Sequence, residues 1–192
     1  NGLTEFCGLR VIEGEVVESF DTLINPQIPI PPIVRKMTGI TDKMVRNAPT
    51  IEEVMPKILN FIGNRIVVSH NTIGDLKFIR HFTKTVCDIT FDNFFVCTHL
   101  LSEKYLAESP DKSLKGLAKY LDVHFEGAHR AEADALITWK LFQVLIQRAL
   151  DGGITTIHEL IRKQGDYESG FRLGWGVPKD TLQNVPARPG IY

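Results

Sequence analysis

The sequence predicts an α/β domain in which a mixed sheet is flanked by helices. Two observations lead to this fold class. The chain opens with two β-rich runs separated by a Glu-Gly-Glu turn, which predicts a hairpin. Short apolar runs then alternate with longer segments whose apolar residues recur at helical spacing. A hairpin followed by strand–helix alternation is typical of mixed sheets with helices on their faces.

The first half of the chain carries the hairpin and one clear helix. The hairpin strands are expected over residues 3–12 and 16–24. Pro31-Pro32 ends a proline-rich connection and can open a short helix, because proline is favoured at the first helical position. A Thr-Ile-Glu-Glu capping box then begins an amphipathic helix over residues 51–62.

The second half continues the alternation. Residues 66–68 form a continuous apolar run, which predicts a strand buried on both faces. A helix is expected through residues 76–82, a strand over 91–97 and a short helix over 114–121. The longest helix is expected over residues 131–150, where a Gly-Gly pair follows it.

These elements divide the chain in two. Residues 1–150 form the predicted domain, and residues 151–192 form a helical extension and a linker. The extension contains a small helix near 156–164, followed by glycine and proline turn-formers with little periodicity. Because the chain begins at Asn1 rather than at a methionine, we expect it to be a piece of a longer protein.

Composition sets ordinary bounds. A chain of 192 residues predicts one domain with a sizeable core. Lys and Arg number 22 against 23 Asp and Glu, so a nucleic-acid partner must be argued from a site rather than from bulk charge. Three cysteines without CxxC spacing indicate reduced thiols. No apolar run reaches membrane-spanning length, so we expect a cytoplasmic protein without a membrane partner.

Three residues have the chemistry of a phosphodiester-cleaving site. Asp75 follows the apolar run 66–68, and Asp134 lies near the start of the longest helix. Carboxylates that converge from different elements are the ligands that Mg²⁺ prefers. His129 precedes that helix, and a histidine that titrates near neutrality can take a proton from water. Each residue alone has an ordinary alternative: a carboxylate favoured at a helix N-terminus, or a surface histidine.

The ordered set of motifs is more specific than any member. It resembles the DnaQ-like exonucleases of the DEDDh class, whose type member is the proofreading ε subunit of the bacterial replicative polymerase. The resemblance extends over about residues 3–150. The motifs that carry it are Ile28–Pro32, Lys36–Thr41, Val68–Asn71 with Asp75, and His129-Arg130-Ala131-Glu132-Ala133-Asp134.

The resemblance implies a ribonuclease H-like fold and 3′–5′ exonucleolysis with two Mg²⁺ or Mn²⁺ ions. It implies single-stranded 3′ ends of DNA as substrate, with RNA as the alternative, and a role in proofreading for a DNA polymerase or in repair. Matched by position, it gives every candidate site residue a role: Asp75 and Asp134 as metal ligands, His129 as general base, His70 and Asn71 beside the site, and Thr38, Gly39 and Ile40 near the 3′-terminal nucleotide.

Two departures from the family pattern matter. Gly74 stands where the family usually has a phenylalanine before the acid of the second motif. The family also begins with a strand that carries Asp-x-Glu, two further metal ligands, and this chain does not contain it. Glu5 matches a position after that strand, which argues against it as a substitute. We therefore expect a sheet that lacks the family's first strand, and a chain that by itself binds metal poorly and is inactive.

The last residues carry a second resemblance. Residues 182–192 resemble the entry to a GIY-YIG nuclease domain, and a proline-rich tail is the alternative interpretation. The resemblance implies an exonuclease–GIY-YIG fusion in DNA repair. Two further classes of function remain open. One is a catalytically degenerate nucleic-acid-binding or scaffold module, and the other is an interaction domain that uses the helical face of residues 51–62.

Overall fold

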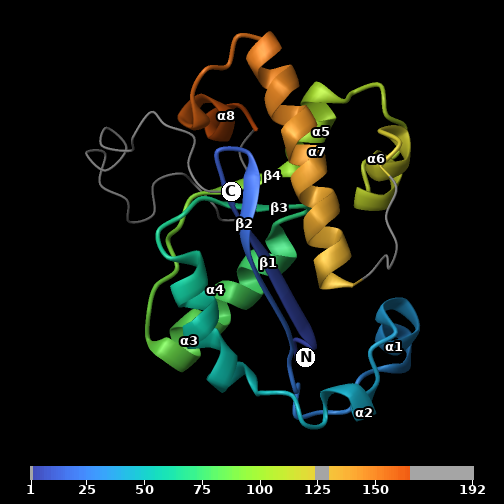
Figure 1. Cartoon of the computed structure of the whole chain (residues 1–192), viewed down its shortest axis with the longest axis vertical. Helices are drawn as coiled ribbons and strands as arrows, with labels where there is room; N and C mark the ends of the chain where they lie inside the picture. Colours follow the sequence, from blue (N-terminus) through green and yellow to red (C-terminus); the bar gives the residue numbers. More distant parts are fainter. Residues whose placement is uncertain (1, 124–129, 165–192) are drawn as a thin grey trace.

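A computed structural model describes residues 2–123 and 130–164 of the chain. His129 and the GIY-YIG-like segment 182–192 lie outside the described residues. Within them the architecture is mixed α/β, as predicted: a β-hairpin, a separate pair of parallel strands, and helices around both (Figure 1). None of the described helices is both long and apolar enough to cross a membrane.

The predicted hairpin is confirmed. β1 (Glu5–Ile12) and β2 (Glu15–Leu23) pair antiparallel, with a register shift after Arg10. The two turn residues, Glu13 and Gly14, have φ of 53° and 87°. Positive φ at both central positions is the geometry of a two-residue hairpin turn that matches the twist of its strands.

The second sheet is smaller than the sequence predicts. β3 (Val67–Ser69) pairs parallel with β4 (Phe95–Cys97). The strand expected over 91–97 is therefore shorter than predicted. The prediction that residues 66–68 are buried on both faces is also wrong, because they are only half-buried and border a cavity. Among the described residues the two sheets share no ladder, so the strands form two pairs rather than one sheet.

Helices α3 (Ile51–Ile62) and α4 (Ile73–Cys87) pack with the hairpin around one core. The capping box is confirmed at the start of α3, where the backbone N–H of Thr50 donates to Glu53 at 2.7 Å. This core fixes the position of α4 relative to β1. Its buried members are Ile24, Val54, Met55, Ile58, Phe61, Ile62, Leu76 and Phe91.

A second core surrounds α7 (Ala131–Asp151), the longest helix (Figure 1). α5 (Thr98–Tyr105), α6 (Leu114–Tyr120) and α8 (Ile157–Lys163) contribute buried residues to it. Because α8 belongs to this core, the helical extension begins as part of the folded domain. The division at residue 150 stays a prediction.

Two short helices lie between the hairpin and α3. α1 (Pro32–Thr38) begins with proline, as predicted, and ends at Gly39, whose φ is 73°. α2 (Asp42–Val45) follows, and neither α2 nor α5 was predicted. Ile30, Ile40 and Val45 form a small core that holds this segment together.

Candidate functional site

A cavity of about 560 Å³ lies between the two sheets. β1 forms one wall and β3 forms another, and α4 and α7 each contribute residues from their N-terminal halves. Most of the lining is apolar, and its charged residues lie near opposite ends of the strands. Glu5 begins β1 and Asp75 follows β3, whereas Arg10 lies near the end of β1 and Arg65 precedes β3. The charged residues and the histidine of the lining are Glu5, Arg10, Arg65, His70, Asp75 and Asp134.

The two predicted carboxylates meet in this cavity. Asp75 lies in the first turn of α4 and Asp134 in the first turn of α7. Burial raises the pKa of the Asp75 carboxyl, and the nearby Ser69 side chain acts in the opposite direction. Among the described residues no lysine or arginine forms an ion pair with Asp75. Carboxylates from two different helices therefore line one space, as a cation site requires.

The described residues fit only part of a metal site. Asp75 and Asp134 supply the hard oxygen donors that Mg²⁺ and Mn²⁺ prefer. However, no group of three or more His, Cys, Asp and Glu side chains that could hold a metal exists in the described part of the chain. A complete site needs further ligands.

His70 lines the cavity, but both of its ring nitrogens bond within the protein. Nε2 lies 3.0 Å from the Lys112 carbonyl, which can only accept, so Nε2 carries the proton. Nδ1 lies 2.9 Å from the Thr98 hydroxyl. Burial and nearby His99 lower the pKa of His70 to about 4. The imidazole is therefore neutral at pH 7, and it ties the end of β3 to α5.

The other predicted contact residues lie apart from the cavity wall. Asn71 is exposed, with φ of 56°. The Thr38 hydroxyl donates to the Val34 carbonyl at 2.9 Å and accepts from the Ile40 N–H at 3.1 Å. Residues 38–40 thus form an ordered helix end, but none of them lines the cavity. Their contact with a 3′-terminal nucleotide stays a prediction.

Sequence reasoning missed the role of Glu5. Its carboxylate is nearly buried, with 7% of the side chain exposed, and it pairs with Arg130 at 2.6 Å. It also accepts the backbone N–H of Ala131 at 2.8 Å. No local pattern could have shown this contact, because the partners are 125 residues apart.

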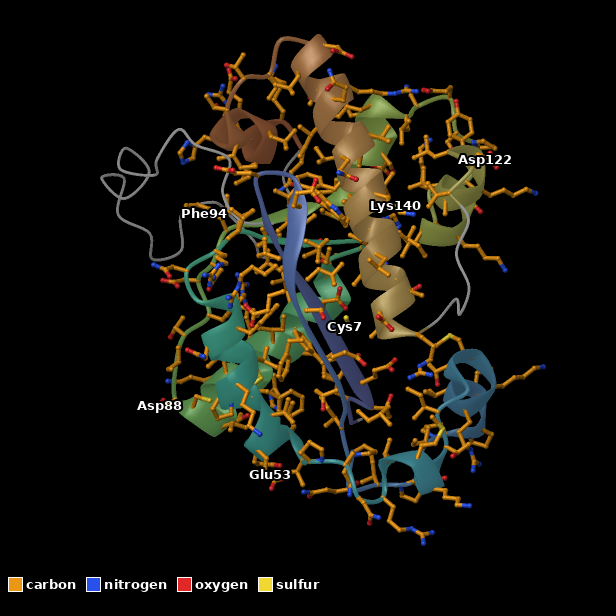
Figure 2. The ribbon with its side chains drawn as sticks, viewed as in Figure 1. Cys7, Glu53, Asp88, Phe94, Asp122 and Lys140 are labelled. Atoms are coloured by element: carbon orange, nitrogen blue, oxygen red, sulfur yellow. The ribbon has the colours of Figure 1, made fainter. Side chains whose placement is uncertain are left out.

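The end of the cavity near Glu5 has an excess of negative charge, and we call it the acidic end. Cys7 and Asp21 are register partners in the hairpin, and Figure 2 labels Cys7 on β1. Burial, together with Asp21, Glu132 and Glu5, raises the pKa of the Cys7 thiol to about 12. Burial and Glu5 also raise the pKa of Asp21. Asp75 and Asp134 belong to this end.

The opposite end, which we call the arginine end, carries Arg10 and Arg65. The Arg10 guanidinium stacks on the Phe61 ring at 4.9 Å, donates to the Phe61 carbonyl at 2.9 Å and pairs with Glu18. Arg65 donates to the Ile62 carbonyl at 3.1 Å. The Nε atom of each arginine is buried without an acceptor among the described residues. This end of the cavity therefore has two buried donors without an acceptor among the described residues.

Comparison with known proteins adds independent evidence. A family described as exonuclease (RNase_T) matches residues 1–142. A Mycobacterium tuberculosis protein named as a bifunctional exonuclease/endonuclease is 35% identical over the whole chain, which spans 30% of that relative's length. The DNA polymerase III subunit epsilon of Aquifex aeolicus is 38% identical over 143 residues, 74% of this chain and 71% of the relative.

A solved structure gives the same result for the fold. Exonuclease X, in complex with 5′ overhanging duplex DNA, superimposes with a TM-score of 0.62 at 26% identity. The match covers 85% of this chain and 92% of that one. The predicted fold class is therefore confirmed.

Proposed function

The chain belongs to the exonuclease family, whose match spans residues 1–142, and from this membership we propose that it is the nuclease domain of a metal-dependent 3′–5′ exonuclease. The observation that carries the proposal is that Asp75 and Asp134, from two different helices, line one cavity. If each carboxylate served only to stabilise the start of its own helix, the two would have no reason to line the same cavity. Membership and geometry thus support the same reaction class.

The proposed roles follow the resemblance, residue by residue. Asp75 and Asp134 bind Mg²⁺ or Mn²⁺, and His129 takes the proton of the attacking water. Divalent cations supply the Lewis-acid chemistry of phosphodiester hydrolysis. His129 lies outside the described residues, so its role rests on the resemblance and on its place directly before Arg130 in the chain. His70, whose ring nitrogens bond within the protein, contributes by holding the end of β3.

We further propose that a strand carrying Asp-x-Glu completes the site between β1 and β3. Among the described residues each of these strands pairs with one neighbour only, so each has an edge without a strand partner. Backbone groups at such an edge are costly when buried unpaired. A strand in the cavity would pair with an edge and bring two more carboxylates to Asp75 and Asp134. The chain without it should bind metal poorly and be inactive.

The substrate we propose is the single-stranded 3′ end of DNA. Support comes from the relatives, which are named as DNA polymerase III subunits and as a bifunctional exonuclease/endonuclease. The match to the bifunctional protein spans the whole chain, including residues 182–192. It therefore favours a fusion with a GIY-YIG endonuclease, acting in cytoplasmic DNA repair, over a separate proofreading subunit. RNA remains the alternative substrate.

The test uses the completed protein, by which we mean the chain joined at its start to a strand with Asp-x-Glu. The completed protein and its variants Asp75→Asn and Asp134→Asn are each incubated with Mn²⁺ and single-stranded DNA that carries a 5′ label, and the rate of digestion is measured. Since a metal contributes several kcal/mol to such a transition state, each variant should lose on the order of a thousandfold in rate. Asp88→Asn and Asp151→Asn, at the opposite ends of the same two helices, are the matched controls (Figure 2 labels Asp88).

Each outcome of this digestion selects a function. Loss in the two cavity variants with full rate in the two controls supports the exonuclease. Full rates in all four variants exclude the assigned site. If the completed protein binds 3′ ends without cleaving them, the scaffold function replaces the enzyme.

A further inference from the structure

Helix α7 begins without a side-chain cap of its own. Arg130 occupies the N-cap position with extended backbone, and no side chain at that position accepts a hydrogen bond from the helix. The first amides of a helix need acceptors, and a carboxylate there also interacts favourably with the helix dipole. Glu5 meets this need from strand β1, because its Oε2 accepts the N–H of Ala131 at 2.8 Å.

The same carboxylate holds the side chain of Arg130. Arg130 Nη2 donates to Glu5 Oε1 at 2.6 Å, and Nε donates to Oε1 at 3.0 Å and to Oε2 at 3.3 Å. A forked contact of this kind fixes direction as well as distance. The Glu5 side chain is 7% exposed and that of Arg130 is 42% exposed, so the pair is partly shielded from solvent. Both carboxylate oxygens are occupied, which leaves Glu5 poorly suited to serve as the missing metal ligand.

One further bond joins this contact to the candidate site. The Arg130 carbonyl accepts the backbone N–H of Asp134 at 3.0 Å, the first hydrogen bond of α7. Glu5 therefore holds Arg130, the residue whose carbonyl accepts the backbone N–H of Asp134. Through Glu5, β1 sets both where α7 starts and how its first turn is oriented toward the cavity.

We propose that Glu5 is a positioning residue, which holds Arg130 and the start of α7 so that Asp134 lines the same cavity as Asp75. This inference rests on the proposed function, because it assigns Glu5 to the geometry of the same metal site. It differs from an ordinary stabilising contact in one respect. Loss of Glu5 should weaken metal binding more than it weakens binding of the nucleic acid.

The test compares Glu5→Ala and Glu5→Gln in the completed protein with Glu18→Gln as the matched control. Glu18 belongs to the same hairpin and also pairs with an arginine, but that arginine is Arg10 of β1 rather than a residue at the start of α7. Mn²⁺ affinity is measured by the free-ion signal in electron paramagnetic resonance, and kcat and KM are measured on single-stranded DNA. Amide hydrogen exchange at Ala131 reports the helix start directly.

We expect Glu5→Ala to weaken Mn²⁺ affinity and to lower kcat by about tenfold each, with KM for DNA unchanged, since a misplaced ligand is lost from the transition state rather than from substrate binding. Exchange at Ala131 should accelerate by a similar factor. Glu5→Gln keeps an acceptor for Ala131 but loses the charge, so its effects should be about threefold. Glu18→Gln should match the unsubstituted protein.

Two results would overturn the proposal, and they differ from failure of the function itself. If exchange at Ala131 accelerates while Mn²⁺ affinity and kcat stay unchanged, Glu5 only stabilises the helix. If KM rises and Mn²⁺ affinity does not change, Glu5 acts on substrate binding. A completed protein that neither binds Mn²⁺ nor cleaves DNA, before any substitution at Glu5, refutes the exonuclease assignment and the positioning role together.

Discussion

The two ends of the cavity differ in how their charges are used. At the acidic end, Glu5 is fully bonded to α7, whereas Asp75 forms no ion pair with a described lysine or arginine. At the arginine end, Arg10 and Arg65 both bond to the C-terminal turn of α3, and each keeps one buried donor without an acceptor. Each end therefore contains a residue that holds the fold, and the arginine end also has buried donors without an acceptor among the described residues.

This difference suggests separate roles for the two ends, with metal binding at the acidic end and stability of the fold at the arginine end. The carboxylates of Asp75 and Asp134 can attract cations, and the buried donors of Arg10 and Arg65 can attract carbonyl or carboxylate oxygens. A strand between the sheets would meet both needs, with its acids near Asp75 and its backbone carbonyls near Arg10 and Arg65. Substitutions at the acidic end should therefore lower the exonuclease rate, and substitutions at the arginine end should lower the free energy of unfolding.

The largest expected effect is at the acidic end. Asp134→Asn should reduce exonuclease activity on the order of a thousandfold, because a neutral amide is a poor ligand for a divalent cation. The free energy of unfolding should fall by about 1 kcal/mol or less, because asparagine keeps the shape of the side chain and loses only a charge that is favourable near a helix N-terminus. Chemical denaturation and DNA digestion on one preparation measure the two quantities. A large loss of stability would show that Asp134 supports the fold instead.

A smaller effect, on the free energy of unfolding, is expected from His70, which lines the cavity and bonds to Thr98 and Lys112. Its pKa is about 4 in the fold and about 6.5 when unfolded, so between these values the unfolded chain binds the extra proton. Stability therefore rises with pH through this window and is fully present above pH 6.5. With allowance for partial exposure, the loss on going from pH 6.5 to 4 should be about 1–2 kcal/mol.

The variant His70→Gln provides the check. It should remove most of this loss, measured as the difference between the two proteins in denaturant midpoint from pH 7 to pH 4. An equal pH dependence in both proteins would contradict the buried, neutral state of His70. His81, which is exposed on α4, is the histidine to substitute as the control.

The smallest effect is expected at the arginine end. Arg65→Met removes the donor to the last carbonyls of α3, a contact of the kind that contributes about 0.5–1 kcal/mol to a helix C-terminus. Exonuclease activity of the completed protein should stay within about twofold, since Arg65 lies away from the two carboxylates. Thermal unfolding and the DNA digestion measure both effects. Loss of activity without loss of stability would place Arg65 in substrate binding.

The fold could be predicted where local physics decides it. The Glu13-Gly14 turn, the capping box at Thr50 and the proline at the start of α1 all act within a few residues, and all three are confirmed. α5 was missed because residues 98–105 follow β4 directly and show no clear apolar periodicity. The half-buried state of β3 could not be predicted, because it depends on the cavity beside it.

The candidate site divides in the same way. Asp75 and Asp134 could be identified from motif order, and the structure brings them to one cavity. The contact between Glu5 and Arg130 could not, because it joins residues 125 apart and neither neighbourhood carries a signal for it. His70 was assigned to the site by resemblance, but only the structure shows that its ring bonds to Thr98 and Lys112.

The most direct test of the central claim is the release of nucleoside monophosphates from 5′-labelled single-stranded DNA with Mn²⁺, measured for the chain alone and for the completed protein. The chain alone should be inactive, because its described residues supply two carboxylates and no third metal ligand. The completed protein should digest from the 3′ end, and Asp134→Asn should abolish that activity. Equal activity with and without the added strand would contradict the claim that the cavity is the unfilled half of the site.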